Sequence, residues 1–210
     1  MDSENLFWNV DTQVDFVEPT GKLYVSGAEL LKEKWAAITQ FASENEIRVI
    51  NTADYHKITS EELSANPDFV HSFPQHCMGG TIGAEYIDET NPECPLLFDW
   101  DKHYPLFPDH EQLLKARNIL IRKDNFDVFL GNENTEELLR IINPKKIFVY
   151  GVTTNVCVDR AVVGLAERGF KVYVFEDAIK ELPNIPIPFE NWDKLGINRI
   201  SFEKVKDFLL

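Results

Sequence analysis

Cysteine is scarce in this chain: three stand among 210 residues, at irregular spacing. An odd number of scattered cysteines argues against a disulfide framework and favours a reducing compartment, so we expect a cytoplasmic protein. Long apolar runs are also lacking, and the first residues are polar and acidic, unlike the start of a secretory leader. We therefore expect no association with a membrane.

Positive charge is in short supply. Lys and Arg total 21 against 35 Asp and Glu, which gives a net charge of −14. This balance argues against nucleic acids and anionic membranes as partners, because both select a basic surface. Internal repeats and low-complexity tracts are missing as well, and 44% of the residues are apolar. Such a composition suffices for the core of a single domain spanning residues 1–210.

Short apolar runs alternate with longer segments of helical periodicity, which is typical of βαβ units. The runs predict strands at residues 6–10, 47–51, 118–122, 146–150 and 172–175. Helices are predicted around residues 31–42, at 135–142 and at 156–168, and a short helix and strand close the chain. The helix at 156–168 is apolar on nearly every side, so a second subunit could cover part of it and we expect a homo-oligomer. The sequence thus predicts a three-layer α/β/α fold with a mainly parallel, doubly wound sheet.

Reactive side chains follow four of the predicted strands: Asp11, Asp54 with His56, Lys123, and Cys157. In an open parallel sheet, the carboxyl ends of the strands share one crevice in which ligands bind. Each residue alone has an ordinary interpretation, as a solvated acid, a surface cation or a buried core thiol. Their joint placement predicts instead that two carboxylates, an imidazole, an amine and a thiol meet in one site.

Cys157 stands at a sharp turn between a predicted strand and the helix at 156–168. Gly151 permits unusual backbone angles at this turn, and the polar residues 153–155 offer oxygens that could cap the helix. A helix N-terminus and a neighbouring Lys123 both stabilise a thiolate. We therefore expect the pKa of Cys157 to lie below its free value of about 8.5.

Three segments around these residues resemble the signature segments of the isochorismatase-like cysteine hydrolases. They are DTQVDF (residues 11–16), KDNFDVF (123–129) and GVTTNVCV (151–158). The likeness continues through GFKV (169–172) and EDA (176–178), so it covers nearly the whole chain. Two further segments, DYH (54–56) and FPQHCMGGT (73–81), resemble the metal-binding segments of nicotinamidases and pyrazinamidases, which many other branches of the family lack.

This resemblance implies a catalytic triad. Asp11 would be the general base, Cys157 the nucleophile that attacks an amide carbon, and Lys123 the cation that holds both charges in register. The resemblance also implies an oxyanion hole formed by the backbone N–H groups of Thr153 and Cys157, with a cis peptide bond between Val152 and Thr153.

The likeness to nicotinamidases further implies a divalent metal ion, zinc with iron or manganese as alternatives, bound by Asp54, His56 and His76. Asp54 and His56 lie two residues apart on an extended segment, where alternate side chains share a face. The fourth ligand is placed at Glu62, with Ser60, Glu61 or water as the alternatives.

The same likeness implies hydrolysis of nicotinamide to nicotinate and ammonia through a thioester, a reaction of NAD salvage and pyridine nucleotide biosynthesis. Phe16 and Phe73 fall where nicotinamidases often place aromatic walls around the pyridine ring, although both could be ordinary core residues.

Residues 153–155 leave the substrate open, because nicotinamidases frequently carry Ala and Asp there, whereas TTN is more usual in other amidase branches. Hydrolysis of another small amide or of a carbamoyl or ureido compound is the second expectation. A catalytically silent binding protein is the third. Isochorismatase activity itself is disfavoured, because true isochorismatases lack the nucleophilic cysteine found here at Cys157.

Overall fold

A computed structural model describes residues 2–104 and 110–209. The strands are β1 Asp2–Val10, β2 Ile47–Asp54, β3 Leu96–Phe98, β4 Asn118–Lys123, β5 Lys146–Val152, β6 Lys171–Lys180 and β7 Asn198–Ile200. The α-helices are α1 Val14–Val17, α2 Lys32–Glu44, α3 His110–Lys115, α4 Val128–Gly131, α5 Thr135–Ile142, α6 Cys157–Glu167 and α7 Phe189–Lys194. Three 3-10 helices are η1 Ala28–Leu31, η2 Ile82–Ala84 and η3 Phe202–Phe208.

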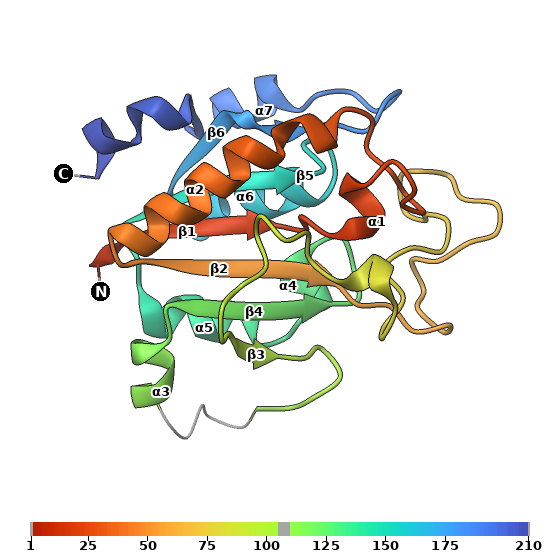
Figure 1. The fold of residues 1–210 in the computed structure, drawn as a ribbon, viewed down its shortest axis with the longest axis horizontal. Helices are drawn as coiled ribbons and strands as arrows, with labels where there is room; N and C mark the ends of the chain where they lie inside the picture. Colours follow the sequence, from red (N-terminus) through yellow and green to blue (C-terminus); the bar gives the residue numbers. More distant parts are fainter. Residues whose placement is uncertain (1, 105–109, 210) are drawn as a thin grey trace.

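The strands form one sheet in the order β3-β4-β2-β1-β5-β6-β7, and every described pairing is parallel. Helix α2 covers one face of the sheet, and α4, α5 and α6 cover the other (Figure 1). Both chain ends lie on the side of the molecule at which the strands begin. The loop after β2 lies on the opposite side, at which the strands finish (Figure 1). The predicted three-layer, parallel α/β/α fold is confirmed.

All five predicted strands are present, and each is longer than predicted. β2 and β4 continue to Asp54 and Lys123, which are register partners in the sheet. These two reactive residues are therefore the last residues of their strands, and do not lie in the loops beyond them. Strand β3 was not predicted, because its three residues are too few for an alternating pattern to stand out.

The central strands β2 and β1 are buried because each lies between two other strands and because helices cover both faces of the sheet. All eight positions of β2 are buried. Helix α2, predicted around residues 31–42, buries Trp35, Ile38 and Ala42.

Elements of the same chain cover the outer side of α6. A Cβ at Gly164 would lie 2.4 Å from the ring of Phe129, which belongs to α4. The indole of Trp192 in α7 donates a hydrogen bond of 2.7 Å to the Asp159 carboxylate on α6. The apolar character of α6 therefore does not require a second subunit.

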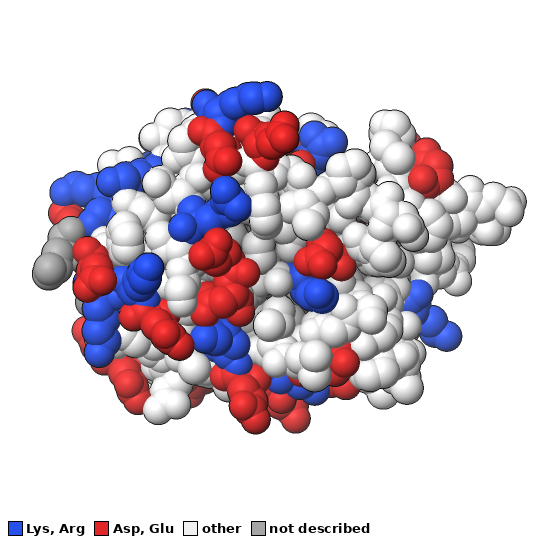
Figure 2. All heavy atoms as spheres, turned by 90° about the horizontal axis from the view of Figure 1, so that it is seen from above, with Lys and Arg blue, Asp and Glu red and all other residues white. Residues whose placement is uncertain are grey.

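Charge is distributed without a basic patch on the face seen from above, where acidic and basic side chains are interspersed (Figure 2). Fewer charged side chains lie toward the end of the molecule at which the strands finish (Figure 2). Among the described residues, no helix has the length and apolarity needed to span a bilayer. All three cysteines are free thiols.

Candidate active site

Four adjacent strands deliver the reactive residues. The order β4-β2-β1-β5 places the ends of these strands side by side, with Lys123, Asp54 and Asp11 at three of them. The segment that follows β5 turns back to begin α6 at Cys157. The convergence predicted from the strand ends is therefore present in the fold.

Asp11, Lys123 and Cys157 lie together in a buried group. The Lys123 ammonium is 3.0 Å from Asp11 Oδ2 and forms a second ion pair with Asp54. One carboxylate oxygen of Asp11, one of Asp54 and the Cys157 sulfur all lie within 4.8 Å of one another. Thr52 donates a hydrogen bond of 2.6 Å to the other Asp11 oxygen, which fixes the carboxylate beside the thiol.

The protonation state of the thiol differs from the expectation. Burial raises the pKa of Cys157 well above its ordinary value, and the Lys123 ammonium, which acts in the opposite direction, does not outweigh it. Burial also raises the pKa of the Asp11 carboxyl, against the opposing effect of Lys123. The expectation of a lowered thiol pKa is wrong for this arrangement, because the buried carboxylates and the loss of water outweigh one cation. The thiol therefore needs a base to become nucleophilic.

The turn before α6 requires glycine. Gly151 has φ of +120°, and a Cβ there would lie 2.0 Å from the carbonyl oxygen of Val10 on the neighbouring strand. The peptide bond between Val152 and Thr153 is cis, as the family resemblance implies.

The predicted helix cap is wrong. Val156 occupies the N-cap position, and no side chain caps the helix there. Asn155 instead holds a different loop: its amide nitrogen donates to the carbonyl of Leu182 at 2.8 Å, and its oxygen accepts from the Leu182 N–H at 3.0 Å. Asn155 therefore fixes the backbone at Leu182, a residue that lines the cavity described below.

The backbone donors at this turn fall into two groups. The N–H groups of Val156 and Val158 donate to the carbonyl of Thr153. The N–H groups of Thr153 and Cys157 differ from these two. Within the described part of the chain, neither donates to a backbone carbonyl in the hydrogen bonds of turns, loops and helix caps. Both of these residues line the cavity described below.

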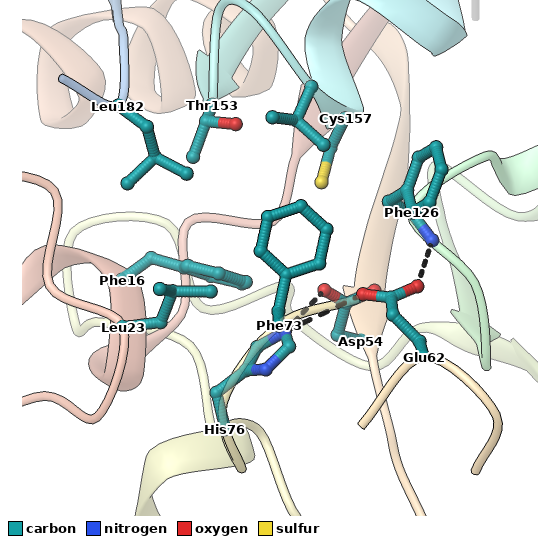
Figure 3. A pocket seen from close by; sticks show the side chains of 11 residues that line it. Phe16, Leu23, Asp54, Glu62, Phe73, His76, Phe126, Thr153, Cys157 and Leu182 are labelled. Carbon is teal, nitrogen blue, oxygen red and sulfur yellow. Dashed lines mark hydrogen bonds and ion pairs between the residues drawn. The ribbon is translucent and has the colours of Figure 1, made fainter. Parts of the chain in front are cut away.

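Asp54, His56, Glu62 and His76 form a second buried cluster. One potential ligand atom from each lies within 4.8 Å of all the others. His56 Nε2 is 3.9 Å from both Asp54 Oδ2 and Glu62 Oε1, and His76 Nε2 is 3.4 Å and 3.9 Å from the same two oxygens. Figure 3 shows His76, Asp54 and Glu62 directed toward one another.

The hydrogen bonds of the two imidazoles leave the same nitrogen available on each. His56 Nδ1 lies 2.9 Å from a carboxylate oxygen of Asp124, and His76 Nδ1 lies 2.8 Å from the carbonyl of Pro74. Because both partners only accept, Nδ1 carries the proton in each ring and Nε2 presents a lone pair to the cluster. His56 Nε2 is buried without a hydrogen-bond partner. The cluster therefore has the donor set and geometry of a divalent metal site.

The fourth position of this cluster is occupied by Glu62. Its Oε2 accepts a hydrogen bond of 2.6 Å from the N–H of Phe126, which leaves Oε1 facing the two imidazoles. Burial and the Asp54 charge raise the pKa of Glu62 to about 7. The alternatives lie elsewhere: the Ser60 hydroxyl bonds Asp124 at 2.5 Å, and the side chain at position 61 is exposed.

A cavity of about 200 Å³ joins the two clusters. The predicted aromatic residues Phe16 and Phe73 both line it, and a third ring, Phe126, does so as well. Figure 3 shows the Cys157 sulfur directed into the space among these rings. The ring centroids of Phe73 and Phe126 lie 6.0 Å apart at 72°, so the wall they form is bent.

Several residues that hold the site were not predicted. The Gln13 side chain accepts from the N–H of Asp54 and donates to its carbonyl, both at 2.8 Å. Asp15 accepts a hydrogen bond of 2.7 Å from the N–H of Cys77, next to His76. Both lie within the DTQVDF segment, and its four polar residues directly after a predicted strand were the available signal.

The described geometry can be compared with known proteins. The isochorismatase domain model matches residues 101–184. The chain is 37% identical over 79 residues to the nicotinamidase/pyrazinamidase of Mycobacterium tuberculosis, a match covering 37% of this chain and 40% of that relative. It is 22% identical over 204 residues to the nicotinamidase of Saccharomyces cerevisiae, covering 84% of this chain and 88% of that relative.

Two solved structures share the fold. The pyrazinamidase of Pyrococcus horikoshii in complex with zinc has a TM-score of 0.71 at 22% identity, covering 95% of this chain and 99% of that chain. N-carbamoylsarcosine amidase from Thermoplasma acidophilum also has a TM-score of 0.71, at 18% identity, covering 94% and 96%. From these matches together, this chain is similar to the isochorismatase-like hydrolases over part of its sequence and shares their fold, and nicotinamidases are among the proteins that it resembles.

Proposed function

We propose that this chain is a metal-dependent cysteine amidohydrolase that converts nicotinamide and water to nicotinate and ammonia. One observation carries the proposal: the Cys157 thiol, which lies in a buried group with Asp11 and Lys123, lines a small aromatic cavity that three residues of the candidate metal cluster also line. The two sequence relatives named nicotinamidases support the same substrate.

The proton path follows from the positions of the triad. Asp11 takes the proton of the Cys157 thiol as the sulfur attacks the amide carbon, and the carbonyl oxygen becomes an oxyanion facing the N–H groups of Thr153 and Cys157. Asp11 then gives this proton to the nitrogen, the carbon–nitrogen bond breaks, and ammonia leaves a thioester.

Hydrolysis of the thioester uses the same groups. Asp11 takes a proton from water as the water oxygen attacks the thioester carbon. The carbon–sulfur bond breaks, the proton on Asp11 returns to the sulfur, and the product is nicotinic acid, which becomes nicotinate by giving its carboxyl proton to the released ammonia or to solvent. Lys123 keeps its charge throughout and holds Asp11 beside the sulfur. The distance from Lys123 Nζ to Asp11 Oδ2 is 3.0 Å.

The metal cluster fits a divalent cation on chemical grounds. Two carboxylates and two imidazole Nε2 atoms converge, and His56 Nε2 has no hydrogen-bond partner. The Lys123 ammonium pairs with Asp54 Oδ1, and Asp54 Oδ2 is the oxygen that faces the imidazoles. Asp54, His56, Glu62 and His76 would hold the ion, with zinc, iron or manganese suited to this ligand set. When bound, the ion would supply a Lewis acid that binds the ring nitrogen of the substrate.

The cavity supports a small, flat substrate. Its empty volume is about 200 Å³ with open solvent included, so the space is narrow. Phe16, Phe73 and Phe126 provide three aromatic walls, which suit a heteroaromatic ring better than a flexible chain. We infer that the ring lies among these side chains, with its carboxamide over Cys157.

A small carbamoyl or ureido compound is the second candidate. The observation that favours it is Thr153, a pocket residue at a position where nicotinamidases frequently carry Ala. Such a substrate would react at the same thiol but would have no ring nitrogen for a metal.

Ammonia release from a substrate panel tests the proposal. Purified protein loaded with Zn²⁺, Fe²⁺ or Mn²⁺ would be given nicotinamide, pyrazinamide, an N-carbamoyl amino acid, and benzamide as the control that lacks a ring nitrogen. We expect turnover of the first two and little of benzamide. Turnover of the carbamoyl compound alone would establish the second candidate, and no ammonia from any substrate would favour a silent binding protein.

A further inference from the structure

His56 is oriented by a charged side chain, whereas His76 is oriented by the backbone. Asp124 Oδ1 lies 2.9 Å from His56 Nδ1, while the acceptor for His76 Nδ1 is the Pro74 carbonyl at 2.8 Å. The His76 ring would therefore keep its orientation through side-chain substitutions around it. The orientation of His56 depends on one side chain from another element.

Asp124 is itself held in place. The Ser60 hydroxyl donates to the same carboxylate oxygen at 2.5 Å, and the Asp124 N–H donates to the carbonyl of Gly131 at 3.2 Å. Its side chain is 18% exposed, and among the described residues no lysine or arginine forms an ion pair with it. Asp124 directly follows Lys123 at the end of β4, so a single strand end serves both the triad and the metal cluster.

We propose that Asp124 is a positioning residue that fixes the tautomer and the ring orientation of His56, and thereby sets the affinity of the cluster for a divalent ion. A carboxylate that accepts a hydrogen bond from one imidazole nitrogen makes the lone pair of the other nitrogen a stronger metal ligand. Loss of such a partner typically costs about 10–100-fold in metal affinity. The inference rests on the metal site of the proposed function.

Zinc affinity of four proteins tests the inference by competition with a chromophoric chelator. We expect the Zn²⁺ Kd of Asp124→Ala to rise about 10–100-fold over wild type. Asp124→Asn should show a smaller loss, because its amide oxygen can still accept from Nδ1. Asp127→Asn is the matched control: it lies in the same loop, caps α4 through the Phe129 N–H, and should bind zinc like wild type.

A second measurement needs no variant. Long-range ¹⁵N–¹H NMR of metal-free wild type above pH 8 should show the His56 proton on Nδ1, and a proton on Nε2 would overturn the proposal. So would an Asp124→Ala protein that binds zinc as tightly as wild type and Asp127→Asn. If wild type itself binds no divalent ion, the metal-dependent function fails together with this inference; if only Asp124→Ala is unaffected, the inference fails alone.

Discussion

The Glu62→Gln variant should stabilise the metal-free protein while weakening its metal site. Glu62 is 3% exposed, and its Oε1 faces Asp54, which is also buried. Burial and that neighbouring charge raise the pKa of Glu62 from 4.5 to about 7, although Lys123 and both imidazoles act in the opposite direction. In the absence of a metal ion, the ionised form of Glu62 therefore destabilises the folded state.

The size and sign of the effect follow from this pKa. A rise of about 2.5 units corresponds to roughly 3 kcal/mol at about 1.4 kcal/mol per unit. Between pH 4.5 and about 7 the folded protein binds more protons than the unfolded chain, so stability falls as pH rises through this range. Gln carries no charge and can still accept from the Phe126 N–H. Metal-free Glu62→Gln should thus be more stable than wild type by up to about 3 kcal/mol at about pH 8, and close to wild type at about pH 4.

Urea unfolding in EDTA across this pH range provides the measurement. Glu61→Gln is the matched control, because Glu61 is exposed and its substitution should change stability by less than about 0.5 kcal/mol. With added Zn²⁺, wild type should become more stable than Glu62→Gln. The ion stabilises the folded state of whichever protein binds it more tightly, and that protein is wild type. A Glu62→Gln protein that is no more stable than wild type at pH 8 would refute the reasoning.

Three further substitutions test the triad and the metal cluster. Cys157→Ala should lower kcat for ammonia release by at least about a thousandfold while the protein still folds, whereas Cys94→Ala, at an exposed thiol, should stay near wild type; substantial activity in Cys157→Ala would show a misassigned nucleophile. Lys123→Met should cost about 3–5 kcal/mol in urea unfolding at pH 7, because it leaves Asp11 and Asp54 buried without their cation, and less at low pH, where both can be protonated. Lys57→Met, whose ion pair with Asp101 is exposed, should cost under about 1 kcal/mol, and equal losses in the two variants would contradict the buried pairing. His56→Ala should lose bound metal on elemental analysis and raise KM for nicotinamide, but not for a carbamoyl substrate that never touches the ion; a metal-free, fully active wild type would rule out the metal assignment.

Sequence periodicity was sufficient for the architecture. Apolar runs of strand length that alternate with helical segments predict a parallel sheet. The segments between the strands are long enough for helical crossovers, and this leaves few other ways to connect the strands. The gathering of Asp11, Asp54, Lys123 and Cys157 follows from the same fact, because parallel strands all finish at one edge of their sheet. Residues at strand ends could therefore be assigned to a common site before any distance was known.

The residues that support the site depended on contacts between distant segments. Among the residues at positions 60–62, only the fold shows which side chain turns inward, because this short loop has no periodicity. The roles of Gln13 and Asp124 arise from hydrogen bonds that span 41 and 68 residues of sequence. No local pattern specifies such partners.

The protonation of Cys157 shows the same division between sequence and tertiary structure. From the sequence, a helix N-terminus and a nearby lysine predict a lowered thiol pKa. In the folded chain the thiol is buried beside Asp11 and Asp54, and its pKa is raised instead. The sequence by itself determined which chemical groups meet at the strand ends, because apolar runs that alternate with helical segments predict parallel strands, and parallel strands all end on the same side of their sheet. Only the tertiary structure decided how deeply these groups are buried and which charges face them, and those two quantities set the free energy of each protonation state.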